Sequence, residues 1–278
     1  MLQLSDLALA LGWLFWGGFF LVQIVVLSRI KGAVGRAIGF IVVSAVFFGP
    51  MVPGWIKKRE FQERQAKARA IFEERCKTAG EKIYKVVEQT DGILLPKIRQ
   101  RTGGASDPMT PSAAAWNEYH GKAYIQDFLM FAEPNRRNRY GKSIVQTRTQ
   151  FPGFDYVEVP DVASGTRSRY TWNPERFLKV EPSPAERPPR YAVDFEDLVD
   201  PVDRQHWVAG SKIRVIDTTD QSIMAELIYF MFEPGLGSKS GQREPWAFAV
   251  ACPNFPYVAT MHRHLADKVL RSAQKVEK

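Results

Sequence analysis

The sequence has few of the residue patterns that build an active site. It contains only two cysteines and four histidines among its 278 residues. It lacks a Cys-x-x-Cys pair, a Gly-x-Ser-x-Gly nucleophile motif and paired carboxylates on a common face. We therefore predict no catalytic residue, no metal site and no cofactor. The sequence favours a protein that is not an enzyme, without deciding the question.

Charged residues are absent from two long apolar runs near the N-terminus. Residues 7–28 and residues 37–56 contain no Lys, Arg, Asp or Glu. A helix of about 20 apolar residues spans a hydrocarbon core of roughly 30 Å, and it satisfies its backbone hydrogen bonds internally. We therefore predict that residues 1–56 form a transmembrane helical hairpin. Gly35 and Gly39 have the spacing that lets two membrane helices, or two copies of the chain, pack closely.

Basic residues are also absent from the N-terminal tail, residues 1–6. This flank and the length of the first run do not fit a cleavable signal peptide. The short loop between the runs carries Arg29, Lys31 and Arg36, which favours a cytoplasmic loop and an extracytoplasmic C-terminal domain. The Lys-Lys-Arg cluster at 57–59 favours the opposite orientation. Giving the short loop more weight, we expect a multi-pass protein of the bacterial inner membrane with a periplasmic domain.

The net charge of +8 has an explanation other than nucleic acid. Many basic residues follow the second apolar run, where they attract lipid headgroups: Lys57, Lys58, Arg59, Arg64, Lys67 and Arg69. We therefore expect the lipid bilayer as a partner, together with a protein partner or self-association through the membrane helices, and we do not expect nucleic acid.

The densest basic run lies at residues 136–142 and contains Arg136, Arg137, Arg139 and Lys142. Arginines beside aromatic residues can hold a nucleotide or nucleic acid. A solvated loop explains the same composition, so both interpretations stay open.

A second candidate for binding is the glycine-rich segment 235–241, with Gly235, Gly237 and Lys239. A phosphate-binding P-loop needs a different spacing and a helix after it, whereas Pro245 and Trp246 follow here. We interpret the segment as a flexible loop between strands, with a mobile binding loop as the functional alternative.

The remaining sequence predicts an α+β domain. Residues 57–89 carry apolar residues at steps of three and four, which predicts a stalk helix that packs on the domain near its end. Within 90–278, alternation at 154–159 and 167–172 predicts one β-hairpin, and 212–217 and 223–232 predict another. Strands joined by short turns predict a mostly antiparallel sheet.

Other elements of the domain are predicted from single residues and shorter patterns. Pro96 predicts that residues 93–98 form an edge strand. The absence of charge predicts a buried strand at 246–251, and residues 259–276 read as a C-terminal helix. Because residues two apart do not share a helix face, His262 and His264 predict solvated imidazoles, not a zinc site with Cys252.

Cys76 and Cys252 are the candidates for a disulfide. Cys76 falls on the apolar stripe of the predicted stalk helix, and Cys252 ends an uncharged segment before Pro253. A bridge between them would suit an oxidising compartment, whereas two unrelated buried thiols would also fit the sequence.

Residues 72–84 (FEERCKTAGEKIY) and the stretch 235–253 resemble uncharacterised bacterial membrane-anchored proteins with a β-rich C-terminal domain. The likeness implies no activity. Two functions stay open: a membrane-anchored structural or binding protein that presents an extracytoplasmic domain to a partner, or a cytoplasm-facing effector that binds a nucleotide or nucleic acid through the Arg-rich loop.

Overall fold

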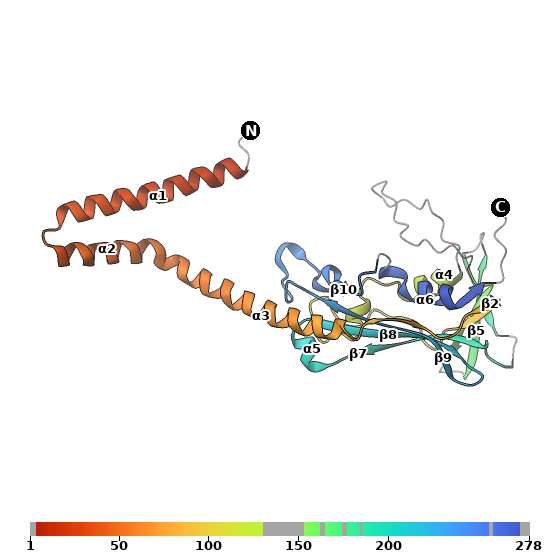
Figure 1. Cartoon of the computed structure of the whole chain (residues 1–278). Coiled ribbons are helices and arrows are strands. Elements are labelled where there is room, and N and C mark those ends of the chain that lie inside the picture. Colours follow the sequence, from red (N-terminus) through yellow and green to blue (C-terminus); the bar gives the residue numbers. More distant parts are fainter. Residues whose placement is uncertain are drawn as a thin grey trace. The chain divides into compact units, whose positions relative to one another are not determined.

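The computed structural model describes residues 4–129, 153–161, 165–173, 177–183, 186–255 and 258–272 (Figure 1). The chain forms two compact units, Met1–Arg64 and Gln65–Lys278, and the boundary between them falls inside helix α3 (Val52–Cys76). The predicted Arg136, Arg137, Arg139 and Lys142 lie outside the described residues.

The first unit is helical. It contains α1 (Leu4–Arg29), α2 (Ala33–Phe48), the short η1 (Gly49–Met51) and the first part of α3. By length and composition, the helical segments Leu9–Arg29 and Ala33–Cys76 are each long and apolar enough to cross a membrane. Most of their large apolar side chains are exposed.

Helices α1 and α2 contact each other through aromatic rings and one polar side chain. Phe19 lies 5.4 Å from Phe47 between ring centroids, and Gln23 Nε2 donates to Ser44 Oγ at 3.1 Å. A Cβ at Gly39 would lie 2.7 Å from the Ile30 side chain, so glycine permits this close approach. The small residues of α2 therefore serve packing within the chain.

The second unit is built on a sheet of nine strands within its described part, in the order β1-β9-β8-β7-β3-β4-β5-β6, with β10 also on β9. Its strands are β1 (Gly80–Ile83), β3 (Gly92–Leu94), β4 (Tyr156–Asp161), β5 (Thr166–Asn173), β6 (Phe177–Pro182), β7 (Tyr191–Leu198), β8 (Val208–Asp217), β9 (Ser222–Phe232) and β10 (Val250–Cys252). A separate parallel pair joins β2 (Val87–Thr90) and β11 (Leu270–Ser272).

The sheet is mostly antiparallel, as the sequence predicts. Both predicted hairpins are confirmed, with Val157 opposite Tyr170 in β4–β5 and Ile213 opposite Leu227 in β8–β9. Within the sheet, β3 is the exception among the described strands, because it runs parallel to both β4 and β7. The α+β class is therefore confirmed, with apolar helices at the N-terminus.

The two faces of the sheet have different covers. The main core lies under η2 (Pro111–Ala115), α4 (Lys122–Leu129) and α6 (Met261–Val269), and Figure 1 shows α4 and α6 on one side of the strands. Side chains alternate along a strand, so Tyr229 and Met231 of β9 enter this core. Phe230 and Phe232 enter the opposite, smaller core with Ala68 of α3.

Three predicted elements are wrong in their bounds. The helix predicted over 57–89 ends at Cys76, and residues 80–83 form β1 instead. Gly80 has φ +149°, and pairing with β9 supplies the backbone hydrogen bonds that a continued helix would have made. The strand predicted over 246–251 is the 3-10 helix η4 (Pro245–Phe248) followed by β10, and the final helix ends at Val269.

The predicted edge strand at 93–98 is also wrong. Strand β3 lies in the middle of the sheet between β7 and β4 and ends at Leu94, before Pro96. Because β3 ends before Pro96, the proline, which has no backbone N–H, does not interrupt the hydrogen bonds of the sheet.

Candidate functional site

Three polar side chains form a row across the middle of the sheet. Asp197 of β7 lies opposite Ser211 of β8, and Ser211 lies opposite Tyr229 of β9. Because residues in register project to the same face, all three side chains point toward the main core. Polar groups in such a place need hydrogen-bond partners.

Arg99 supplies a partner to Asp197 and to Ser211. Its guanidinium forms an ion pair with Asp197 and donates to Ser211 Oγ at 2.9 Å. Its Nε lies 3.3 Å from Glu118 Oε2, and its Cζ lies 3.8 Å from the centre of the Phe195 ring. The charge of Arg99 is thereby paired although its side chain is almost inaccessible, while its Nε contacts Glu118 as an ion pair without a hydrogen bond.

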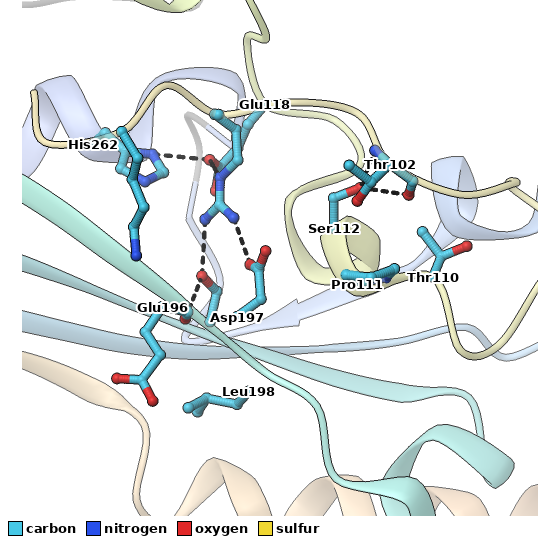
Figure 2. Close-up of polar contacts among 12 residues, drawn as sticks. Thr102, Thr110, Pro111, Ser112, Glu118, Glu196, Asp197, Leu198 and His262 are labelled. Carbon is cyan, nitrogen blue, oxygen red and sulfur yellow. Dashed lines mark hydrogen bonds and ion pairs between the residues drawn. The ribbon is translucent and has the colours of Figure 1, made fainter. Parts of the chain in front are cut away.

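Glu118 connects this row to α6. It follows η2, where its N–H donates to Ala115 O at 3.0 Å, and its carboxylate accepts a hydrogen bond from the Tyr229 hydroxyl. His262, near the start of α6, places Nδ1 2.8 Å from Glu118 Oε2. Figure 2 shows His262 beside Glu118, joined to it by a dashed line, with Asp197 below them. We call Arg99, Asp197, Glu118, Tyr229 and His262 the buried polar cluster.

The protonation states follow from the geometry. Burial would raise the pKa of Glu118, but His262 and Arg99 outweigh it and hold the pKa at about 2. Burial lowers the pKa of His262, which keeps its imidazole neutral near pH 7. Burial opposes the charge on Arg99, yet Glu118, Tyr229 and Asp197 raise its pKa above the usual value.

An imidazole oriented by a carboxylate is the arrangement of a general base. His262 Nε2 is buried without a hydrogen-bond partner, as is the Tyr124 hydroxyl beside it. However, the side chains of Glu118 and His262 are only 1% and 3% exposed. A substrate could not reach them without displacing packed side chains, so the arrangement supports a structural role that joins α6 and the 99–118 segment to the sheet.

The predicted glycine-rich loop is organised around another buried carboxylate. Glu233 accepts hydrogen bonds from the N–H groups of Gly235 at 2.9 Å and Gly237 at 2.7 Å, and it pairs with Arg243. A Cβ at Gly237, which has φ +83°, would lie 2.1 Å from the Trp207 ring. The backbone donors that an anion would use therefore hold Glu233, while Lys239 remains exposed.

Binding at these loop residues and at the Arg136–Lys142 run stays a prediction. The arginines that come next in the sequence among the described residues are paired: Arg167 and Arg169 both contact the buried Glu158, at 2.9 and 2.8 Å. They do not provide free positive charge for a polyanion.

Cys76 and Cys252 form a disulfide, with Cα atoms 5.7 Å apart. It joins the end of α3 to β10, and other contacts support the same junction. Phe72 packs on Phe232 with ring centroids 5.6 Å apart, and Arg75 pairs with Asp203 of α5 (Pro201–Gln205) at 2.7 Å. The predicted link between the stalk helix and the last part of the sheet is thus present.

The prediction of two solvated histidines is wrong for His262. Helix α6 buries Met261, His262, Arg263 and Leu265, because this short helix packs against the sheet in the main core instead of starting in solvent. The described residues contain no group of three or more His, Cys, Asp or Glu able to hold a metal ion.

The sequence interpretation missed Arg99 and Glu118 entirely. Both lie outside regular strands and helices, so no periodicity identifies them. A usable signal existed in the partner strands, where Ser211 and Tyr229 occupy core-facing positions between Ala209, Ile213, Leu227 and Met231. Polar residues in such positions require a buried partner.

Comparison of the chain with protein-family models, curated proteins and solved structures finds no match in any of the three. The resemblance carried by residues 72–84 and 235–253 therefore leads to no family assignment.

Proposed function

We propose that this chain is a membrane-anchored structural or binding protein of the bacterial inner membrane. Helices α1 and α2 insert as a transmembrane hairpin, and the sheet unit lies on the extracytoplasmic side, where it contacts a partner protein or envelope component. The observation that carries the proposal is the exposure of apolar side chains along both helices.

Burial of apolar surface stabilises a protein by roughly 25 cal/mol per Å². Exposure of the apolar side chains of α1 and α2 to water would therefore be unfavourable in free energy. Trp13 is 78% exposed, and Leu14, Ile24 and Val46 are each exposed by two thirds or more. Hydrocarbon covers such a surface without a protein partner. Lipid headgroups then meet the exposed basic residues that begin at Lys57.

Two features support the extracytoplasmic side. Disulfides persist in oxidising compartments such as the periplasm and are rare in the cytosol, which fits the Cys76–Cys252 bridge. The short loop with Arg29, Lys31 and Arg36 carries the charge typical of a cytoplasmic loop. Large domains cross a membrane despite basic flanks, so the cluster at 57–59 is compatible with this orientation.

A topology experiment tests the proposal. In a bacterial host, we expect a periplasm-active reporter fused after Lys278 to be active and a cytoplasm-active reporter to be silent. The chain should remain in the membrane fraction after carbonate washing. Activity of the cytoplasmic reporter alone would reject the orientation and favour the effector that binds nucleotide or nucleic acid, and release by carbonate would reject insertion.

A further inference from the structure

We propose that the outer edge of β6 pairs antiparallel with β6 of a second copy of the chain, with the two-fold axis at Val180, so that one sheet runs through a dimer. This inference goes beyond the proposed function. It does not depend on whether α1 and α2 enter a membrane.

Strand β6 is one of the two free ends of the sheet within the described residues. One side of β6 pairs with β5, from Asn173 opposite Phe177 to Ser168 opposite Pro182, and no described strand pairs with the other side. At the opposite end, the edge is divided between β1 and β10, which both pair with β9 and have only four and three residues, against six in β6. An uncovered strand of this kind presents unpaired backbone groups to another chain.

The backbone of β6 offers most of these groups in the pattern that an antiparallel partner needs, and Pro182 at its end can accept a hydrogen bond but has no N–H to donate. Ser183 N–H donates to Arg167 O at 2.7 Å, which fixes the alternation along the strand pair. Lys179 and Glu181 therefore direct their backbone groups to β5, and Leu178 and Val180 direct theirs outward. A second β6 centred on Val180 would exchange both hydrogen bonds with this residue.

The charges of β6 complement themselves about the same axis. Lys179 and Glu181 lie on one face of the strand, each about half exposed, and pair with each other at 2.5 Å. Antiparallel pairing about Val180 places Lys179 opposite Glu181 of the second copy, and the reverse, which gives two cross-strand pairs of opposite charge. Such pairs stabilise a sheet, and like charges directly opposite destabilise it.

Other registers are disfavoured by the same residues. An axis at Lys179 would place lysine opposite lysine, and an axis at Glu181 would place glutamate opposite glutamate. On the other face, the axis at Val180 joins two valines that are each 51% exposed in the single chain. The interface is then isologous, with the same surface on both subunits, as in most closed dimers.

Cysteine cross-linking of the full chain in detergent tests the register. Directly opposed residues of a hydrogen-bonded pair have Cα atoms about 5.5 Å apart, which suits a disulfide. Both native cysteines are already joined, so Val180→Cys adds the only free thiol. We expect mild oxidation to yield a covalent dimer from Val180→Cys and little from Val199→Cys, a control site that is 47% exposed. Equal cross-linking at both sites would overturn the proposal.

Charge exchange tests the same interface without a covalent bond. Lys179→Glu places four carboxylates together, and we expect the dissociation constant of the dimer to rise on the order of tenfold. The double variant Lys179→Glu/Glu181→Lys restores both opposite-charge pairs and should restore the wild-type value. Light scattering after size exclusion reads the mass, and circular dichroism checks the fold. A monomeric wild type, or a double variant no better than the single one, would overturn the proposal.

Discussion

The two units of this chain bury opposite kinds of side chain. In α1 and α2, apolar residues such as Trp13 and Leu14 are exposed, while Gln23 is buried. In the sheet unit, Arg99, Glu118 and His262 are buried inside an apolar core. In the function proposed above, hydrocarbon covers the first arrangement, whereas the second requires that each buried charge has a partner. We therefore expect substitution of a buried polar residue to change the free energy of unfolding strongly in the sheet unit and only slightly in the helical unit.

The largest effect is expected for Arg99→Met. This substitution leaves Glu118 and Asp197 together without their common cation, and breaking a buried ion pair costs about 3–5 kcal/mol. The matched control is Arg214→Met, because the Arg214–Glu196 pair at 2.9 Å is partly exposed and should be worth less than about 1 kcal/mol. Urea unfolding of the full chain in detergent, followed by tryptophan fluorescence, measures both. Equal losses for the two variants would contradict the distinction.

The next effect concerns the disulfide, which lies entirely within the sheet unit. Cys76→Ser opens a bridge between residues 176 positions apart, and we expect a loss of about 2–5 kcal/mol in the free energy of unfolding. Reduction of the wild type should give the same loss, whereas reducing agent should not affect the variant. The helicity of the first unit should persist after reduction. A wild type whose urea midpoint is insensitive to reductant would contradict this expectation.

A pH dependence separates Asp267, a buried acid paired with Arg263, from Asp220, an exposed acid that accepts local hydrogen bonds. Burial raises the pKa of Asp267 to about 6, above the value of about 3.9 in an unfolded chain. The unfolded chain therefore releases this proton first, and the contribution of Asp267 to stability falls as the pH rises from 4 to 6. Relative to the wild type, Asp267→Asn should gain on the order of 3 kcal/mol across that range.

Asp220→Asn is the control for this titration. Hydrogen bonds from Ser222 lower the pKa of Asp220, so its stabilising contribution is present above the unfolded value and is lost only in stronger acid. The difference in stability between Asp220→Asn and the wild type should stay constant from pH 4 to 7. Parallel profiles for Asp267→Asn and the wild type would show that Asp267 does not titrate in this window.

The sequence predicts the parts of this chain that depend on local pattern. Alternation places Ile213 and Leu227 in one core-facing hairpin, and a run without charge locates α1 and α2. It does not predict where α3 ends, because Ala79 and Ile83 continue a helical spacing while pairing with β9 takes over the backbone. The sequence also does not predict the contact between Arg99 and Glu118. Both residues lie in irregular segments, and the folded sheet and α6 bring them together.

The smallest effect is expected for Gln23, the buried polar residue of α1. Gln23 donates to Ser44 Oγ at 3.1 Å and to Phe40 O at 3.3 Å, while its own Oε1 is buried without a partner. Leucine at this position loses the hydrogen bonds but also removes an unsatisfied acceptor. Polar contacts between membrane helices average only about 0.6 kcal/mol, so we expect Gln23→Leu to change the unfolding free energy by no more than about 1 kcal/mol.

A titration with denaturing detergent in mixed micelles measures this change through the loss of α1–α2 contact, reported by fluorophores on the two helices. Ser28→Ala is the control, because its hydroxyl bonds to Val25 O in its own helix at 2.8 Å. The two variants should differ only slightly. A loss of several kcal/mol for Gln23→Leu would mean that Gln23 acts like Arg99, as a polar group on which its unit depends. The contrast between the exposed apolar side chains of the first unit and the buried charges of the sheet unit would then fail.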